Sequence, residues 1–215
     1  MVPTRRQTML TAVGSVAVLP GCSFLSGEEP ASFAAQPATV ASETHSEAGY
    51  EERGVSQQVE TREFSAGDES RSVEVTNHLA RYERRVDLDP IGSERAAAFT
   101  VLASPEVEVL GETFNPLEDL SEREILDRFD SEYENLSVGD MVDSQTVSAL
   151  GTQTTVEKYE GTADLAGTTV DVFVHVTKLR HESDFVVVVA LYPQRLSGEE
   201  SNVLSMVSGL RHTGQ

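Results

Sequence analysis

The chain has 215 residues, 39% of them hydrophobic, which is typical of one large or two small folded domains and excludes a disordered chain. Its 16 lysine and arginine residues and 36 acidic residues give a formal net charge of −20. This charge argues against nucleic acid or an anionic lipid surface as a partner, because both are polyanionic.

The basic residues are mostly arginine, since Lys158 and Lys178 are the two lysines among the 16. At about 1 M salt the Debye length is about 3 Å, so the repulsion among surface carboxylates largely disappears. We therefore expect this chain to come from a halophile, an organism that grows in high salt. An ordinary acidic protein with few lysines by chance is the alternative.

Residues 1–21 are typical of an export signal. Arg5 and Arg6 precede an apolar run over 9–19, and no acidic residue is present. A membrane span needs about 20 apolar residues, so this shorter run fits the apolar region of a signal peptide. The surrounding Thr4-Arg5-Arg6-Gln7-Thr8-Met9-Leu10 resembles a twin-arginine export signal, from which Thr8 and Leu10 depart. The general secretory route is the alternative.

The next residues, Leu19-Pro20-Gly21-Cys22, resemble a lipobox, in which Leu19 and the small Gly21 precede the sole cysteine. Pro20 departs from that pattern. The resemblance implies that the Cys22 thiol carries a glyceryl lipid, whose two chains hold a protein stably at about 0.8 kcal/mol per buried CH₂. The expected location is the cell membrane, facing outside the cytoplasm. An inert cysteine beside a cleavage site is the alternative.

The expected mature chain has two parts. Residues 22–31 are a lipidated tether, polar and containing glycine and proline, in which the nine residues 23–31 span roughly 15–18 Å as a flexible coil. Residues 32–215 contain no repeat and no second linker, so they are expected to form a single domain.

The first half of this domain is expected to be mainly strands. Residues 37–47 predict a short helix, and alternation from Tyr50 onward predicts a hairpin that turns at Gly67-Asp68. The apolar phase slips between Leu79 and the later pair Tyr82 and Val86, which predicts a β-bulge or a twist. Residues 96–103 predict another strand. The apolar loop 105–116 is expected to fold back onto the core, with a partner surface as the alternative.

Two capping boxes frame the second half. Ser121 and Glu124 predict a helix to about residue 135, and Ser197 and Glu200 predict a helix through Leu210. Between them, strands are expected at 142–150, 152–160 and 168–178, the last with one buried valine face and one wet face. The continuous apolar run 185–191 predicts a central strand covered on both faces. The expected fold class is α+β, an antiparallel β-sheet with helices packed on it.

Short phrases in this order resemble an uncharacterised lipoprotein family of halophilic archaea, known as a domain of unknown function. The resemblance supports the membrane localisation and implies no activity. An apolar two-sided strand followed by a helix opened by Gly198-Glu199 is also distantly similar to PsbP-like domains, which implies an α/β/α sandwich. The phrases that carry the first resemblance are Asn77-His78-Leu79-Ala80, Val107-Glu108-Val109-Leu110-Gly111, Phe114-Asn115-Pro116 and Leu191-Tyr192-Pro193.

Familiar motifs for a nucleophile, a phosphate or a dinucleotide are absent from the sequence, so no cofactor is expected. The five histidines are scattered, and His175 and His181 lie six residues apart, a spacing that suits neither a helix nor a strand pair of ligands. No metal site is expected.

Two further features are candidate sites. Arg81, Arg84 and Arg85 form a local basic cluster, which suits contact with an anion or a partner through bidentate hydrogen bonds. Pairing with neighbouring glutamates is the alternative. Asn135 begins an Asn-Leu-Ser glycosylation sequon, a three-residue pattern that also arises by chance.

Together these features favour a membrane-anchored extracytoplasmic lipoprotein with a non-catalytic binding or accessory role in the cell envelope. Its expected partners are membrane lipid through Cys22 and an envelope protein. The alternative is an envelope hydrolase that uses His78 or His175 with a nearby Asp or Glu.

Overall fold

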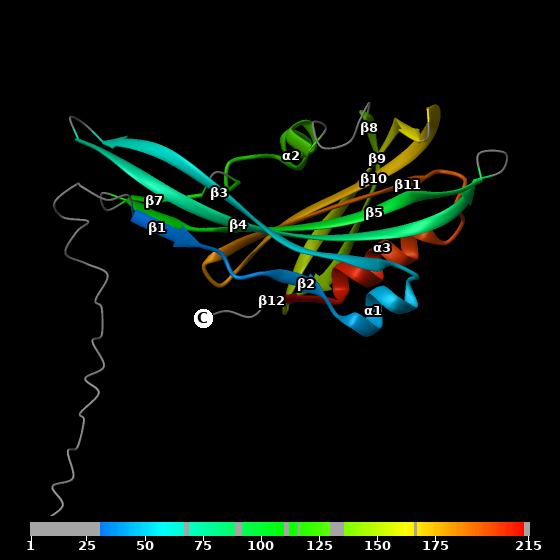
Figure 1. Ribbon diagram of the computed structural model, residues 1–215, viewed down its shortest axis with the longest axis horizontal. Coiled ribbons are helices and arrows are strands. Elements are labelled where there is room, and N and C mark those ends of the chain that lie inside the picture. Colours follow the sequence, from blue (N-terminus) through cyan, green and yellow to red (C-terminus); the bar gives the residue numbers. More distant parts are fainter. Residues whose placement is uncertain are drawn as a thin grey trace, which may run out of the picture.

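The computed structural model describes residues 31–66, 69–88, 92–109, 112–115, 117–129, 136–165 and 167–212. Within these ranges the chain forms twelve strands and three helices (Figure 1). The helices are α1 (Ser42–Glu47), α2 (Glu122–Phe129) and α3 (Glu199–Ser208). The strands are β1 (Ala31–Ala34), β2 (Ala38–Val40), β3 (Glu51–Ala66), β4 (Glu69–Leu88), β5 (Gly92–Pro105), β6 (Val107–Val109), β7 (Glu112–Phe114), β8 (Ser137–Ala149), β9 (Thr152–Leu165), β10 (Thr168–His181), β11 (Asp184–Pro193) and β12 (Leu210–His212).

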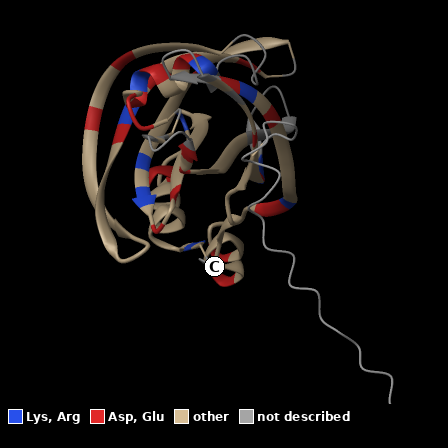
Figure 2. Ribbon diagram, turned by 90° about the vertical axis from the view of Figure 1, so that its left-hand side faces the viewer, with Lys and Arg blue, Asp and Glu red and all other residues tan. Residues whose placement is uncertain are grey.

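Eight strands form one sheet in the order β1-β4-β5-β11-β10-β9-β8, with β3 also paired to β4. The sheet is mixed because β1 runs parallel to β4, whereas the other pairings are antiparallel. It twists and curls strongly, so that the view along it resembles a ring (Figure 2). Separate ribbons are formed by β2 with β12 and by β6 with β7.

The predicted α+β class is wrong, because the fold is mostly β. The three helices have 6, 8 and 10 residues, whereas β3, β4 and β5 have 16, 20 and 14. Curling lets the sheet cover itself, since Ala149 of β8 and Tyr82 of β4 belong to one core cluster. The helices therefore form no continuous layer, and the implied PsbP-like α/β/α sandwich is also overturned (Figure 1).

Strand β11 lies at the centre of the fold and is buried along its whole length. Val186, Val188 and Ala190 pack in a first core, which includes Val203, Met206 and Val207 of α3. The alternate residues Val187, Val189 and Leu191 pack in a second core with Ile125 and Leu126 of α2. The prediction of a central strand covered on both faces is confirmed.

Strand β10 differs from its prediction on one face. Val172, Val174 and Val176 are buried in the second core, as the alternation indicates. The opposite face was expected to be wet, but His175, Thr177 and Leu179 are also buried. The reason is again the curl of the sheet, which places the first core over this face.

The predicted hairpin of β3 and β4 is confirmed, but its phase slip has a different cause. Leu79 and Tyr82 are both buried and lie on opposite faces of β4, because both faces of this strand pack against other parts of the chain. One register shift lies between Glu52 and Gly54 of β3 opposite β4, and another lies between Arg84 and Arg85 opposite β5, after Tyr82 and before Val86.

The expected helix over 37–47 is shorter than predicted. Residues 38–40 form β2 instead, because they pair with β12 near the other end of the chain. The loop after Pro105 forms the β6–β7 hairpin, and Val107 packs on Val73 and Val75, which confirms that this segment folds back. Over the described ranges, no helix combines the length and the apolar character that a membrane span requires.

The two predicted capping boxes have different outcomes. At α2, Glu124 accepts hydrogen bonds from the Ser121 backbone N–H at 2.9 Å and donates its own N–H to the Ser121 hydroxyl at 3.3 Å, so the box is confirmed. At α3, Gly198 occupies the cap position with φ +82° and no side chain caps the helix. The prediction there is wrong, because Glu199 and Glu200 bind other parts of the fold.

Candidate functional site

Several predicted site residues lie outside the described ranges. These are the export arginines Arg5 and Arg6, the lipobox residues Leu19 and Gly21, the lipidation candidate Cys22 and the sequon residue Asn135. Their roles stay predictions from the sequence.

The three clustered arginines of β4 are not gathered around one point. Arg84 forms an ion pair with Glu199 of α3. Arg81 donates to the Ser56 hydroxyl of β3 at 3.2 Å, and Arg85 is exposed beyond the register shift. One member of the cluster therefore already holds a carboxylate of this chain.

Glu199 is the centre of a polar cluster beneath α3, where its side chain is 2% exposed. One carboxylate oxygen accepts the Tyr50 hydroxyl at 2.7 Å, and the other accepts from Arg84 and from the Asn202 amide at 3.2 Å. Burial and the neighbouring Glu199 charge raise the pKa of Tyr50 far above its ordinary value. The hydroxyl therefore stays protonated and acts as a permanent donor.

Glu200, the next residue, makes a second set of contacts across the same face. It accepts from the Lys158 ammonium at 2.8 Å and from the Gln145 amide at 2.7 Å. The ammonium also lies 4.0 Å from the centre of the Phe173 ring, a cation–π contact. These bonds attach the start of α3 to β8 and β9.

His175 of β10 is also buried. Its Nε2 is 3.1 Å from the Tyr192 hydroxyl, and the two rings stack with centres 5.5 Å apart. Burial lowers the pKa of His175 to about 4, with smaller and opposing effects from Glu200 and Lys158. The ring is therefore neutral near pH 7, and its hydrogen bond goes to a phenol rather than to a carboxylate.

His78 is likewise bound to an uncharged group. Its Nε2 lies 3.1 Å from the Gln57 amide, whereas its buried Nδ1 and the buried Oδ1 of Asn77 have no hydrogen-bond partner within the described part of the chain. A general base must reach a substrate proton and is usually oriented by a third group. The observed hydrogen bonds of His78 and His175 do not supply that arrangement.

The histidine that does bind an aspartate was not identified from the sequence. His212 of β12 contacts Asp184 of β11 at 3.0 Å, and His181 of β10 at 2.9 Å. His181 and Asp184 face each other across a two-residue turn, which the sequence could have indicated. His212 is 28 residues from Asp184, and no local pattern links them.

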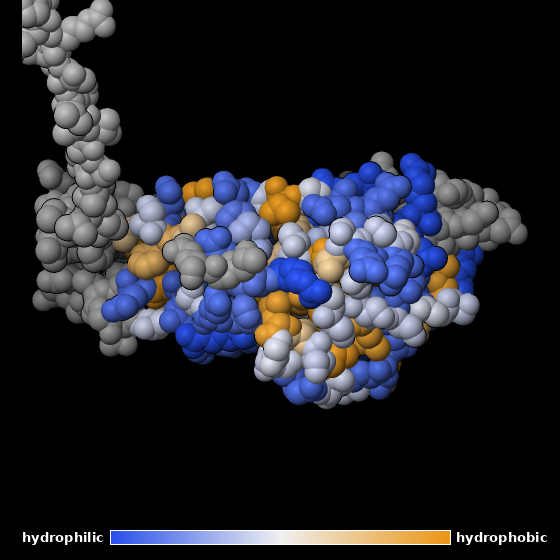
Figure 3. Space-filling view, turned by 90° about the horizontal axis from the view of Figure 1, so that it is seen from below, coloured by the Kyte–Doolittle hydropathy of each residue, from blue (hydrophilic) through white to orange (hydrophobic). Residues whose placement is uncertain are grey.

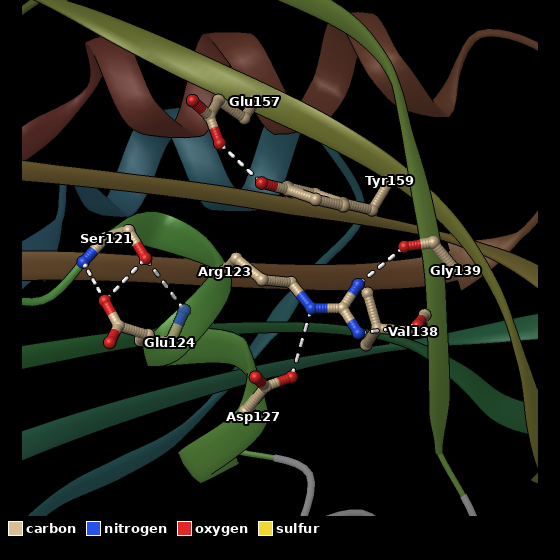
Figure 4. Close-up of polar contacts among 8 residues, drawn as sticks. All are labelled: Ser121, Arg123, Glu124, Asp127, Val138, Gly139, Glu157 and Tyr159. Atoms are coloured by element: carbon tan, nitrogen blue, oxygen red, sulfur yellow. Dashed lines mark hydrogen bonds and ion pairs between the residues drawn. The ribbon is translucent and has the colours of Figure 1, made fainter.

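The second core carries a different polar group around α2 (Figure 4). Arg123 donates to the backbone carbonyls of Val138 and Gly139 at 3.0 and 2.6 Å and to Asp127 at 3.1 Å. On the neighbouring strand the Tyr159 hydroxyl donates to Glu157 at 2.7 Å. Each of these groups has partners within the chain, so the arrangement joins α2 to β8.

An open cleft lies where β10 begins and β11 ends. Its volume is about 490 Å³, and it presents one acidic and one basic side chain, Asp171 and Arg195. The other lining residues are Thr169, Val170, Pro193 and Gln194. The lining thus mixes polar and apolar side chains. In the ranges that the structure describes, no three His, Cys, Asp or Glu side chains are arranged to hold a metal ion.

Comparison with known proteins gives a family without an activity. The family model described as a domain of unknown function (DUF6517) matches residues 37–211, which spans β2 to β12. No curated protein matches the chain.

Proposed function

Because the chain belongs to the family described as a domain of unknown function (DUF6517), which brings no assigned activity, we propose a function from its own residues. The protein is a membrane-anchored extracytoplasmic lipoprotein of a halophile, with a non-catalytic binding or accessory role in the cell envelope. Its relatives are then lipoproteins of halophilic archaea.

The observation that carries the proposal is the placement of Cys22. The only cysteine of the chain directly follows Leu19-Pro20-Gly21 and the apolar run, and the family match begins at Pro37. Residues 23–36 therefore separate the proposed lipid from the family domain. Since the mature chain, with 14 basic and 36 acidic residues, has a net charge of −22, an anionic membrane would repel it and the lipid must hold it.

The use of lysine supports growth in high salt. Lys178 donates to the carbonyls of Leu117, Glu118 and Leu120 at 2.7–3.0 Å, and Lys158 binds Glu200. Both lysines of the chain thus hold tertiary structure together. The remaining cations are arginines, which are more weakly hydrated than ammonium groups and keep their charge under all conditions.

The site geometry supports binding more than catalysis. The hydrogen bonds of His78 and His175 go to an amide and a phenol, and the cleft between β10 and β11 is lined partly by polar side chains. On the face that carries α1 and α3, apolar residues form separate patches among hydrophilic ones (Figure 3). A polar partner in the envelope fits this surface.

The anchor is tested by expressing the full chain and Cys22→Ser in a halophilic host and separating membranes from soluble fractions in molar salt. We expect the parent in the membrane fraction, with a glyceryl lipid found by mass spectrometry, and the variant outside it. Ser23→Ala is the matched control and should stay with the membrane. Equal retention of Cys22→Ser, or a parent protein in the cytosol with residues 1–21 attached, would overturn the proposal.

The binding role is tested separately, by cross-linking and affinity isolation of the tethered protein in molar salt. A partner that remains bound to the parent protein supports an accessory role. Hydrolysis of an envelope substrate by the purified protein, lost in a His78→Gln or His175→Gln variant, would contradict the accessory role and favour the alternative, an envelope hydrolase.

A further inference from the structure

Three side chains from three strands form a continuous hydrogen-bonded chain. Asp184 Oδ2 lies 3.0 Å from Nε2 of His212, whose Nδ1 lies 2.9 Å from Nδ1 of His181. The same Asp184 oxygen accepts the backbone N–H of Gln36 at 2.7 Å. The β10–β11 hairpin is thereby joined to β12 and to the link between β1 and β2.

The chemistry of the groups assigns the protons in this chain. An ionised Asp184 accepts only, so Nε2 of His212 donates to it. A neutral His212 then has a lone pair on Nδ1, and Nδ1 of His181 must donate to it. One proton between the two rings closes the contact.

The ring geometry excludes a metal ion shared by this pair. The ring centres are 5.1 Å apart and the two Nδ1 atoms 2.9 Å apart, a difference close to twice the radius of an imidazole ring. The two nitrogens therefore face each other head-on. Ligands of one metal ion would direct their lone pairs toward a third point.

We propose that His181 and His212 form a pH-sensitive lock between the β10–β11 hairpin and the β2–β12 ribbon. When the histidine pair binds one proton, one Nδ1 still donates and the other still accepts, and the Asp184 carboxylate compensates the positive charge. When the pair binds a second proton, two N–H donors and two positive charges face each other, because each protonated imidazole donates from both nitrogens. The contact then opens.

The charged groups nearby do not replace this interaction. Arg180 of β10 is paired with Glu106, which follows β5, and Arg211 of β12 donates to the carbonyls of Gly209 and Leu210. Glu182, in the turn between β10 and β11, is exposed. Strand β2, Gln36 and the end of β5 bring no ionisable side chain, so Asp184 is the charge that faces the pair directly within the described ranges, which end at His212.

Opening has a defined structural consequence. His212 pairs with Ala38 in the β2–β12 ribbon, and one residue separates Gln36 from Ala38. Both ends of the described domain, the segment after β1 and the last strand, are therefore held by the lock. Acid should loosen these two segments together and leave β10 and β11 paired.

Amide hydrogen exchange of the full chain tests the lock from about pH 8 to about pH 4, a range that includes histidine titration. After correction for intrinsic exchange, we expect the protection of Gln36 and residues 210–212 to fall at least about tenfold more than that of residues 186–190. In His181→Gln this step, the larger loss of protection in acid, should disappear. The glutamine amide N–H donates to a neutral His212, and the glutamine amide oxygen accepts from a protonated His212.

His45→Gln is the matched control, because His45 bonds the Tyr50 carbonyl outside this chain of contacts, and it should keep the acid step. His175 is present in every variant, so its own acid response cancels in the comparison. Retention of the step by His181→Gln, or its absence from the parent, would overturn the lock. Should His181→Gln not fold, ring-nitrogen shifts of the parent decide: near pH 8 the lock requires Nδ1 of His181 protonated and Nδ1 of His212 bare.

Discussion

Helices α2 and α3 both follow a Ser-x-x-Glu sequence, yet they use it in opposite ways. At α2 the serine and glutamate bond each other at an exposed helix end. At α3 the helix begins at a left-handed Gly198, and its glutamates reach across the sheet to Arg84, Tyr50 and Lys158. A local motif thus forms where the surroundings are solvent, and tertiary partners override it where the helix end is buried.

The difference also divides the molecule energetically. The α3 side holds a buried carboxylate and a buried neutral histidine, groups whose desolvation makes their partners essential. The α2 side holds an exposed cap and an exposed ion pair between Arg123 and Asp127, which contribute little each. Changes near α3 should therefore have larger effects than matched changes near α2.

The largest effect is expected for Arg84→Met, which leaves the Glu199 carboxylate buried without its cation. Breaking such a pair costs about 3–5 kcal/mol of unfolding free energy. Glu199→Gln should cost less, about 1.5–3 kcal/mol, because the Arg84 side chain is 34% exposed and water can solvate it. Urea unfolding in molar salt, followed by far-UV circular dichroism, measures both values.

A double variant provides the control for this pair. Arg84→Met with Glu199→Gln should be more stable than Arg84→Met alone, because no buried charge remains. If Arg84→Met cost less than about 1 kcal/mol, as expected for the exposed Arg123–Asp127 pair, the assignment of α3 as the sensitive side would fail.

The next effect is a dependence of stability on pH, caused by His175. Its pKa in the folded protein is about 4, below the ordinary value of 6.5, so the unfolded chain binds the proton more readily. The contribution of the neutral His175 to the free energy of unfolding is fully present above about pH 6.5. It is lost as the pH falls toward 4, in total by about 3 kcal/mol. The exposed Glu124 also loses a contribution in acid, because hydrogen bonds from Ser121 lower its pKa.

The variant His175→Gln keeps a hydrogen-bonding group beside Tyr192 but does not titrate. We expect its unfolding free energy to fall with acid by about 3 kcal/mol less than that of the parent. His45→Gln should keep the parent's slope, since His45 lies outside the His175–Tyr192 contact. Equal slopes for His175→Gln and the parent would mean that folding does not lower the pKa of His175.

The same contrast explains which elements the sequence could predict. The two-sided burial of β11 and the cap of α2 follow from residues within a few positions of one another, and both are confirmed. The curl of the sheet, the pairing of β2 with β12 and the Asp184–His212 contact depend on residues far apart in the chain. Periodicity carries no information about these contacts, so the predicted share of helix is too large and the contact between His212 and Asp184 is not predicted.

The smallest effect offers the most direct comparison of the two helix ends. Ser121→Ala removes the hydroxyl that accepts the hydrogen bond from the Glu124 backbone N–H, and it should lower the free energy of unfolding by about 1 kcal/mol. Ser197→Ala, at the matching position before α3, should cost within about 0.5 kcal/mol of nothing, because Gly198 caps that helix without any side-chain bond. Unfolding both variants side by side in urea measures the difference. Equal costs would mean that Ser197 caps α3 in solution, and that Glu200 must leave Lys158 to complete the second box.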